Sequence, residues 1–175
     1  MDKVDEEKRN EIFLNRKSQL EAKANNFKIE FFQTSIWENT LYKAWSNILA
    51  SIIPNKDIIK ELLEKYAKAC QADEVILFEK NTLLCITSFH NKDIKDEERF
   101  EKICFSMKRF KNTCYLEDKK YNHFLIKNKI NTIYIQDFEN STILMIVLPN
   151  SNASLELVKL NLEISKKSFK EIMNN

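Results

Sequence analysis

The 175-residue sequence contains no glycine, whereas average usage of about 7% would give about twelve. Glycine adopts positive φ readily and lets backbone N–H groups approach a bound phosphate closely. The two common phosphate-binding patterns, G-x-x-x-x-G-K-[ST] and G-x-G-x-x-G, therefore cannot occur here. As written, the chain has no phosphate-binding loop.

Composition limits the size and class of the protein. A chain of this length with 43% hydrophobic residues can form one large or two small domains with an ordinary core. No apolar run reaches about 18 residues and no signal peptide opens the sequence. We therefore expect a soluble cytoplasmic chain that reaches membranes only through partners. The net charge of +2 does not indicate a class of partner.

Few side chains are available for metal binding or catalysis. The only histidines are His90 and His123, which is little material for a histidine-based metal site or a Ser-His-Asp triad. We predict no catalytic residues and no metal site. The four cysteines form no C-x-x-C pair, which favours buried, reduced thiols over a zinc site. They are Cys70, Cys85, Cys104 and Cys114.

The stretch from Thr34 to Pro54 predicts the junction of two domains. Ser35 and Glu38 fit the capping-box pattern, so a helix should begin near Ser35. Pro54 disfavours the α conformation of the residue before it and should end that helix. We therefore predict domains at residues 1–54 and 55–175. Six apolar residues of the helix recur at helical spacing and predict one buried stripe: Leu41, Ala44, Trp45, Ile48, Leu49 and Ile52.

The first domain has the pattern of an incomplete α/β unit. Residues 5–24 mix charged residues with Ile12, Phe13 and Leu20, which predicts a surface helix with a narrow apolar stripe. Residues 26–32 have alternating and then adjacent apolar side chains, which predicts a short strand. One strand cannot form a sheet alone, so partner strands are missing from this fragment.

The second domain predicts an α+β fold. Its pattern is a helix over 58–71, a hairpin of strands at 74–78 and 82–89, a helix from 96, strands at 121–127, 130–138 and 142–148, and a last helix over 155–172. This order describes one five-stranded antiparallel sheet with helices on its faces and without an obvious catalytic cleft. The charged ends of strand 121–127 are typical of an edge strand, and an exposed edge can recruit a partner strand.

Two helices of this domain carry stripes that predict core packing. The stripe of the first consists of Ile58, Leu62, Leu63, Tyr66, Ala67 and Cys70, and that of the last consists of Leu155, Val158, Leu162, Phe169 and Ile172.

The helix from residue 96 has an apolar stripe with two interpretations. Spacing by three or four residues fits ordinary core packing and also fits direct contact with a dimer partner. The stripe consists of Phe100, Ile103, Met107 and Phe110, with Cys104 beside it.

A basic stretch lies within and after this helix. Residues Lys108 to Lys129 include seven Lys or Arg against Glu117 and Asp118. Aromatic residues are sparsely interleaved, so a solvated face or a scaffold contact is favoured over nucleic-acid binding.

Several short motifs point to one family. They are Thr34-Ser35-Ile36-Trp37, Thr40-Leu41-Tyr42-Lys43-Ala44-Trp45, Ala72-Asp73-Glu74-Val75, Leu77-Phe78-Glu79 and Arg99-Phe100-Glu101-Lys102-Ile103. Together they closely resemble Rag GTPases of the A/B type, from the end of the G domain onward. Met1-Asp2 is similar to the last two residues of the family's guanine-recognition motif, His-Lys-Met-Asp. Arg9, Ile12-Phe13, Arg16 and Leu20 resemble the family's segment on the C-terminal side of that motif.

The resemblance implies a fold and partners. Residues 55–175 would be a roadblock (longin-like) domain, preceded by the C-terminal remnant of a G domain at 1–54. The roadblock domain would pair with that of a C/D-type Rag subunit. The heterodimer would dock on a Ragulator-type scaffold at the lysosome or vacuole membrane and recruit the TOR complex when amino acids are plentiful. The implied dimer interface consists of Phe100, Ile103, Met107, Phe110, Tyr121, His123 and Leu125.

The resemblance also implies part of a guanine site. Asp2 would accept hydrogen bonds from the guanine ring, and Ser35 and Ile36 would lie in the loop under the base. The phosphate loop, the switch regions, the magnesium ligands and the motif's His-Lys are absent from this sequence. GTP, GDP and Mg²⁺ are therefore expected only in a full-length family member, and no cofactor is expected for this chain alone.

Three functions remain in order of preference. The chain is the C-terminal part of a Rag-type GTPase, or it is a free-standing roadblock module that works in dimerisation or scaffolding without binding nucleotide. The third is a basic nucleic-acid-binding protein.

Overall fold

The computed structural model describes residues 6–24, 27–35, 40–91, 99–116, 122–127, 129–139, 141–150 and 154–173. The chain forms two compact units, residues 1–44 and 45–175. The division falls within helix α2 (Thr40–Ile52), and each unit is described by itself.

The first unit contains helix α1 (Glu6–Lys23) and an extended segment over residues 27–35. The side chains of Ile12 and Leu20 on α1 are exposed, as expected for a surface helix. The strand predicted over 26–32 is wrong for the residues described, because the extended segment belongs to no sheet. Alternating apolar residues become a strand only when a neighbouring strand takes up their backbone hydrogen bonds.

The predicted start of α2 near Ser35 stays a prediction, because residues 36–39 lie outside the described residues. Helix α2 is described from Thr40, and Ser35 is not helical, which is also the conformation of a residue that caps a helix. The backbone N–H of Ser35 donates to Thr40 Oγ1 at 2.8 Å, so a hydroxyl five residues later takes this hydrogen bond. Glu38, the other half of the predicted capping box, lies outside the described residues.

The apolar stripe predicted on α2 is buried only in part. Ala44 is buried, whereas Leu41, Trp45 and Ile52 are exposed. Leu49 packs against the core of the second unit. The helix crosses the division between the two units, with Ala44 in the first and Leu49 in the second.

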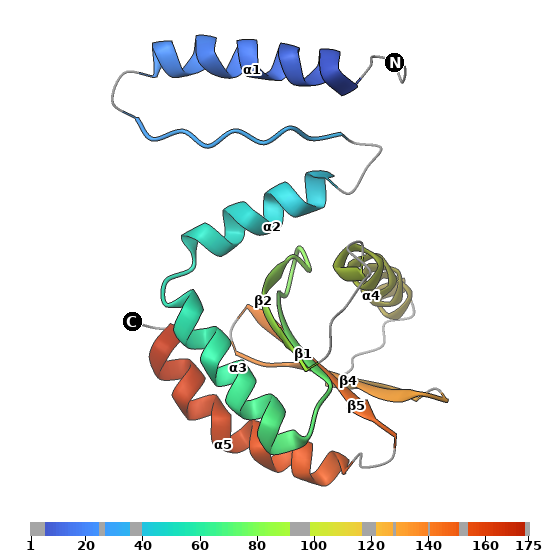
Figure 1. The fold of residues 1–175 in the computed structure, drawn as a ribbon. Helices are drawn as coiled ribbons and strands as arrows, with labels where there is room; N and C mark the ends of the chain where they lie inside the picture. The colour runs from blue at the N-terminus through green and yellow to red at the C-terminus, as the bar shows by residue number, and fades with distance from the viewer. Residues whose placement is uncertain are drawn as a thin grey trace. The chain divides into compact units, whose positions relative to one another are not determined.

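The second unit is an α+β fold built on one antiparallel sheet (Figure 1). Its strands lie in the order β2-β1-β5-β4-β3, which places β3 at one edge as the sequence predicted. In chain order the elements are α3 (Lys56–Cys70), β1 (Glu74–Glu79), β2 (Cys85–His90), α4 (Arg99–Leu116), β3 (His123–Lys127), β4 (Asn131–Asp137), β5 (Thr142–Pro149) and α5 (Leu155–Met173).

Helices α3 and α5 cover one face of this sheet, and the main core lies between them and the strands (Figure 1). The Tyr66 hydroxyl donates to the Val158 carbonyl at 3.1 Å and joins the two helices inside this core. The predicted stripe of α5 is confirmed, with Val158, Leu162 and Phe169 buried. On α3 one position was wrong: Ile58 is exposed, and the neighbouring Ile59 is buried instead.

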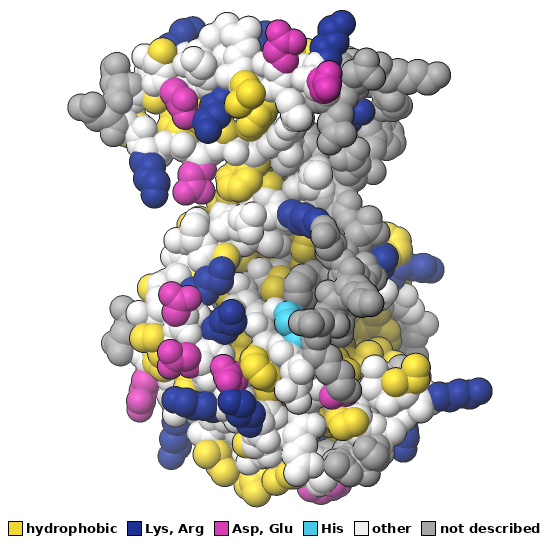
Figure 2. Space-filling view, viewed as in Figure 1, with side chains coloured by type: hydrophobic (Ala, Val, Ile, Leu, Met, Phe, Trp, Pro, Cys, Tyr) yellow, Lys and Arg dark blue, Asp and Glu magenta, His cyan; other side chains and the backbone are white. Residues whose placement is uncertain are grey.

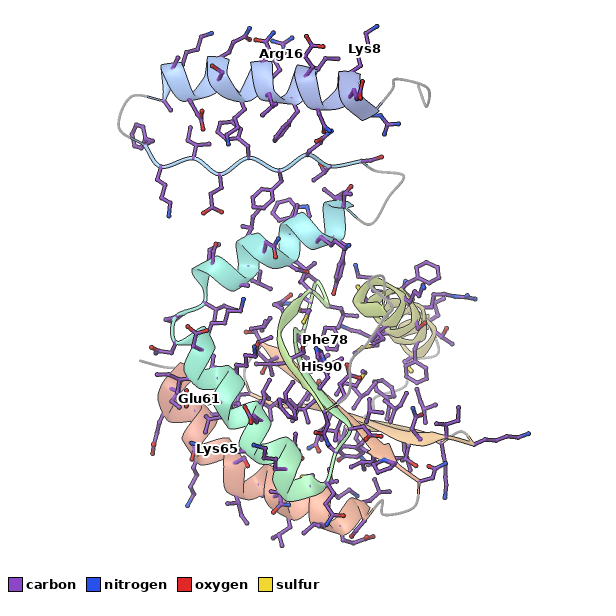
Figure 3. All side chains as sticks on the ribbon, viewed as in Figure 1. Lys8, Arg16, Glu61, Lys65, Phe78 and His90 are labelled. Carbon is purple, nitrogen blue, oxygen red and sulfur yellow. The ribbon has the colours of Figure 1, made fainter. Side chains whose placement is uncertain are left out.

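Helix α4 lies on the other side of the sheet from α3 and α5 (Figure 1). Successive strand residues point to opposite faces, so Ile76 and Phe78 of β1 lie here. Both are fully buried and stand outside the core that faces α3 and α5; Figure 3 shows Phe78 within the sheet layer. Cys104 and Met107 of α4 are buried as well.

Without glycine, other residues occupy the left-handed backbone region. Among the described residues they are Asn55, Gln71 and Leu83, with φ of 58°, 52° and 58°. Leu83 shortens the predicted strand 82–89, because positive φ is incompatible with the extended conformation, and β2 starts at Cys85. Its side chain is fully buried, and this apolar burial offsets the cost of the backbone.

We predict that Gln71→Gly raises the free energy of unfolding by about 1 kcal/mol, because Gln71 follows the last residue of α3 in the left-handed conformation. Its backbone N–H bonds to the Ala67 and Lys68 carbonyls, which a glycine retains. Urea unfolding followed by circular dichroism gives the comparison. Lys65→Gly, inside the same helix, is the control and should lower stability by about 1 kcal/mol. A lower stability for Gln71→Gly would contradict the prediction.

Candidate pairing surface

Helix α4 and edge strand β3 leave a group of apolar side chains uncovered in the second unit. We call this group the pairing surface. Phe105 of α4 is 63% exposed and Leu116 is 83% exposed, well above what core packing leaves. The members of the pairing surface are Phe105, Phe110 and Leu116 of α4 and Leu125 and Ile126 of β3, with Leu125 on the face of the edge strand opposite to α4.

The inner side of α4 is attached to the sheet. The Lys111 ammonium donates to the Lys80 carbonyl at 2.8 Å, and the Cys104 thiol contacts the Thr82 carbonyl at 3.8 Å. Both carbonyls belong to the loop between β1 and β2. With Met107 also buried, these contacts hold the helix against the sheet and turn its other side outward.

An aromatic pair joins α4 to β3. The rings of Phe110 and Phe124 meet edge to face with their centroids 4.2 Å apart. Such an arrangement brings the positive ring edge to the negative ring face and stabilises by about 0.5–1.5 kcal/mol beyond burial. Phe110 is still 46% exposed, so it serves both the fold and the surface.

Strand β3 pairs with β4 and lies at the end of the sheet order. Among the described residues no strand lies on its outer side, so that edge presents backbone N–H and C=O groups. The Leu125 side chain lies on the same face as His123, whose ring lies 5.5 Å from that of Tyr134. Ile126 lies on the α4 face with Phe124.

The structure divides the predicted interface residues into three groups. Met107 is buried and belongs to the core, and Ile103 is half-buried. Phe110, His123 and Leu125 are exposed where a partner could reach them. The Phe100 side chain and Tyr121 lie outside the described residues.

Sequence reasoning missed Phe105, Leu116 and Ile126. Phe105 lies outside the 100–103–107–110 spacing, which marks the side of α4 nearer the sheet. The available signal was an aromatic residue among lysines on the opposite side of the helix. Ile126 lies inside the predicted edge strand, and the alternation of side chains along that strand places it on the face opposite to Leu125.

The guanine-binding role that the resemblance implies for Asp2, Ser35 and Ile36 stays a prediction. Asp2 and Ile36 lie outside the described residues. Ser35 is described, and its backbone N–H bonds to Thr40.

Cys70 and Cys104 are buried, as predicted, whereas Cys85 and Cys114 are half-buried. Burial raises the pKa of Cys85 to about 12 and also raises the pKa of Cys70. Both are therefore protonated at neutral pH and are poor nucleophiles. Within the described parts of the chain there is no group of three or more His, Cys, Asp or Glu that could hold a metal ion. None of the described helices is long and apolar enough to cross a membrane.

Solved structures define the class of fold. MglB of Myxococcus xanthus matches with a TM-score of 0.58 at 16% identity, covering 69% of this chain and 91% of that one. A Roadblock/LC7 domain from Streptomyces avermitilis matches with a TM-score of 0.50 at 9% identity, covering 66% and 98%. The α+β unit with its five-stranded antiparallel sheet is thus a roadblock/LC7-like fold, as predicted.

Sequence comparison then gives the family. The model of the Gtr1/RagA G protein conserved region matches residues 1–107. The chain belongs to the Gtr1/RagA family and is a relative of the A/B-type Rag GTP-binding proteins.

Individual relatives agree with this assignment. Ras-related GTP-binding protein A of Dictyostelium discoideum is 35% identical over 100% of this chain, which covers 58% of that protein. Ras-related GTP-binding protein B of Rattus norvegicus is 33% identical over 98% of the chain and 46% of that protein. GTP-binding protein GTR1 of Saccharomyces cerevisiae is 34% identical over 97% and 59%. The chain spans about half the length of these relatives.

A double-mutant cycle tests the contact that holds α4 to the edge strand. We expect Phe110→Ala and Phe124→Ala to destabilise the chain with a coupling free energy of about 0.5–1.5 kcal/mol, because either change removes the ring contact. Urea unfolding of the four proteins measures it. The pair Phe110→Ala and Phe169→Ala serves as control, because Phe169 packs on Phe138 in the other core. Strict additivity of Phe110 and Phe124 would contradict the assignment.

Proposed function

We propose that this chain is a Rag-type pairing subunit whose roadblock-like domain, residues 55–175, forms a heterodimer with a C/D-type Rag subunit. The observation that carries the proposal is the pairing surface: exposed apolar side chains of α4 lie beside the open edge of β3. An edge strand can add a partner strand through its backbone, while the helix supplies apolar area. Membership in the Gtr1/RagA family supports the choice of partner.

The arrangement fits pairing better than catalysis. Phe105, Leu125 and Ile126 would lose their exposed apolar area against a partner, which is the driving force for association. The backbone groups at the outer side of β3 would gain partners at the same time.

Residues 1–54 are proposed as the C-terminal remnant of a G domain. The proposed role of the heterodimer is amino-acid signalling to the TOR complex, on a Ragulator-type scaffold at the lysosome or vacuole membrane. The chain would be cytoplasmic and would reach that membrane through its partners. The relatives are named Ras-related GTP-binding proteins and GTP-binding protein GTR1, which supports the G-domain assignment; the signalling role and the membrane are what the family resemblance implies.

Nucleotide binding is proposed for full-length family members only. The relatives are named GTP-binding proteins, and Asp2, Ser35 and Ile36 are the positions that would meet a guanine base. The residues of this chain do not fit the phosphates, because its sequence has neither glycine phosphate-binding pattern. Base contacts without phosphate contacts supply little affinity. The alternative function is therefore a free-standing roadblock interaction module without nucleotide binding.

Pairing is tested by placing a charge on the edge strand. We expect Leu125→Asp to weaken binding to a coexpressed C/D-type Rag subunit by at least about 30-fold. The new carboxylate would be buried in the interface without a compensating positive charge or hydrogen bond. Leu160→Asp is the matched control: Leu160 is 58% exposed on α5 and Leu125 is 47% exposed on β3. Co-purification followed by interferometry measures affinity, and circular dichroism verifies folding. Equal binding by both variants would contradict the proposed surface.

Calorimetric titration with nucleotide tests the free-standing module. We expect no heat of binding when GTP or GDP with Mg²⁺ is added to the purified chain at concentrations up to about 1 mM, which corresponds to less than about 4 kcal/mol of binding free energy. Measurable GTP affinity would refute the free-standing module.

A further inference from the structure

We infer that the pairing surface selects a partner domain with an acidic matching face and rejects a second copy of this chain. This inference rests on the pairing function proposed above and adds the chemistry of the partner. It comes from the distribution of charge on α4 and on the edge strand.

Every charged residue from Lys102 to Leu116 is basic, and the acidic residue of α4 is Glu101, whose side chain lies outside the described residues. Three of the basic residues surround Phe105 on the helix surface: Lys102 precedes it by three residues, and Lys108 and Arg109 follow it by three and four. Residues at these spacings are neighbours on a helix. We call Lys102, Lys108 and Arg109 the basic collar.

The basic collar is exposed and lies close to the apolar group. All three of its side chains are exposed, and the Arg109 guanidinium carbon lies 5.8 Å from the centre of the Phe105 ring. At that distance the cation is attracted to the ring face, so charge and apolar group form one unit. On the edge strand and just beyond it, Lys127 and Lys129 are exposed too.

The opposite side of the unit has a different charge pattern. Over α3 and α5, basic and acidic side chains are interspersed (Figure 2). The Lys68 ammonium lies 2.6 Å from the Glu64 carboxylate, and the Lys166 ammonium lies 2.5 Å from that of Glu163. The excess of basic over acidic residues on α4 is therefore a local property and does not follow from the lysine-rich composition.

The basic collar would oppose a symmetric homodimer of this chain. A two-fold homodimer uses the same surface on both subunits, so two copies would bring basic collars together around the Phe105 side chains. Like charges placed across an interface oppose association, and opposite charges specify the partner. A partner of the same fold with acidic residues around an apolar contact would satisfy both the rings and the collar.

Mixing two charge variants tests the inference without knowledge of the natural partner. The double variant Lys108→Glu/Arg109→Glu reverses the collar on the intact chain. The control, Lys65→Glu/Lys167→Glu, makes the same change in net charge on α3 and α5, where Lys65 points outward (Figure 3). Sedimentation velocity is run on each protein alone and on equimolar mixtures with wild type, at about 50 mM and about 500 mM NaCl. Circular dichroism verifies that both variants fold.

We expect wild type and the collar variant each to be monomeric alone at low salt, and their mixture to form a heterodimer. The affinity of that heterodimer should fall at least about tenfold at the higher salt, because ions screen exposed charges. The control variant mixed with wild type should remain monomeric.

Three outcomes would overturn the inference. If wild type alone dimerises at low salt and Leu125→Asp abolishes that dimer, pairing through this surface stands and charge selection is wrong. If the control mixture associates as well as the collar mixture, net charge and not the collar is responsible. If the collar mixture fails to associate at either salt concentration, charge selection is wrong, and pairing with a C/D-type subunit is judged by the Leu125→Asp experiment alone.

Discussion

Burial of strand β5 on both faces is the constraint on which the second unit depends. All residues from Thr142 to Leu148 are buried, because β1 and β4 flank the strand and helices cover both sides of the sheet. Alternation sends Leu144 and Ile146 toward α3 and α5 and sends Ile143 and Met145 to the opposite face. Each such side chain contributes about 1.5–3 kcal/mol when fully buried, so this strand links both cores.

The two sides of the sheet are closed differently, and the candidate surface results from that difference. On one side, α3 and α5 pack together and share the buried hydrogen bond from the Tyr66 hydroxyl to the Val158 carbonyl. On the other side, α4 is held through its inner residues and through the Phe110–Phe124 pair. In the part of the chain that the structure describes, Phe105 and Leu116 on the outer side of α4 remain exposed. Such an exposed group beside an open strand edge indicates an interaction site.

A chain without glycine must make its tight turns with residues that are less suited to positive φ. Asn55 tolerates this conformation because Asn is enriched there, whereas Gln71 and Leu83 carry a steric cost. In the β1–β2 loop, Glu79 accepts hydrogen bonds from the backbone of Asn81 and Thr82, at 3.0 and 2.6 Å. Side-chain hydrogen bonding and the burial of Leu83 thus hold a loop that glycine would otherwise form easily.

Patterns within a few residues predicted most of the second unit and little of the first. The order of helices and strands, the edge position of β3 and the α5 stripe follow from local periodicity, because burial on one side requires it. The strand over 26–32 did not follow, since a strand depends on a neighbouring strand elsewhere in the chain that takes up its backbone hydrogen bonds. On α3, spacing alone could not choose between Ile58 and Ile59.

The sequence by itself therefore determined the fold class, the family motifs, the basic character of α4 and the lack of any glycine phosphate-binding pattern within these 175 residues. Only the tertiary structure decided that Met107 belongs to the core while Phe105 faces outward, and that Phe110 is shared between an internal contact and the surface. The reason is physical: helical spacing identifies which residues share a side of the helix, but the sheet against which α4 packs determines which side is covered.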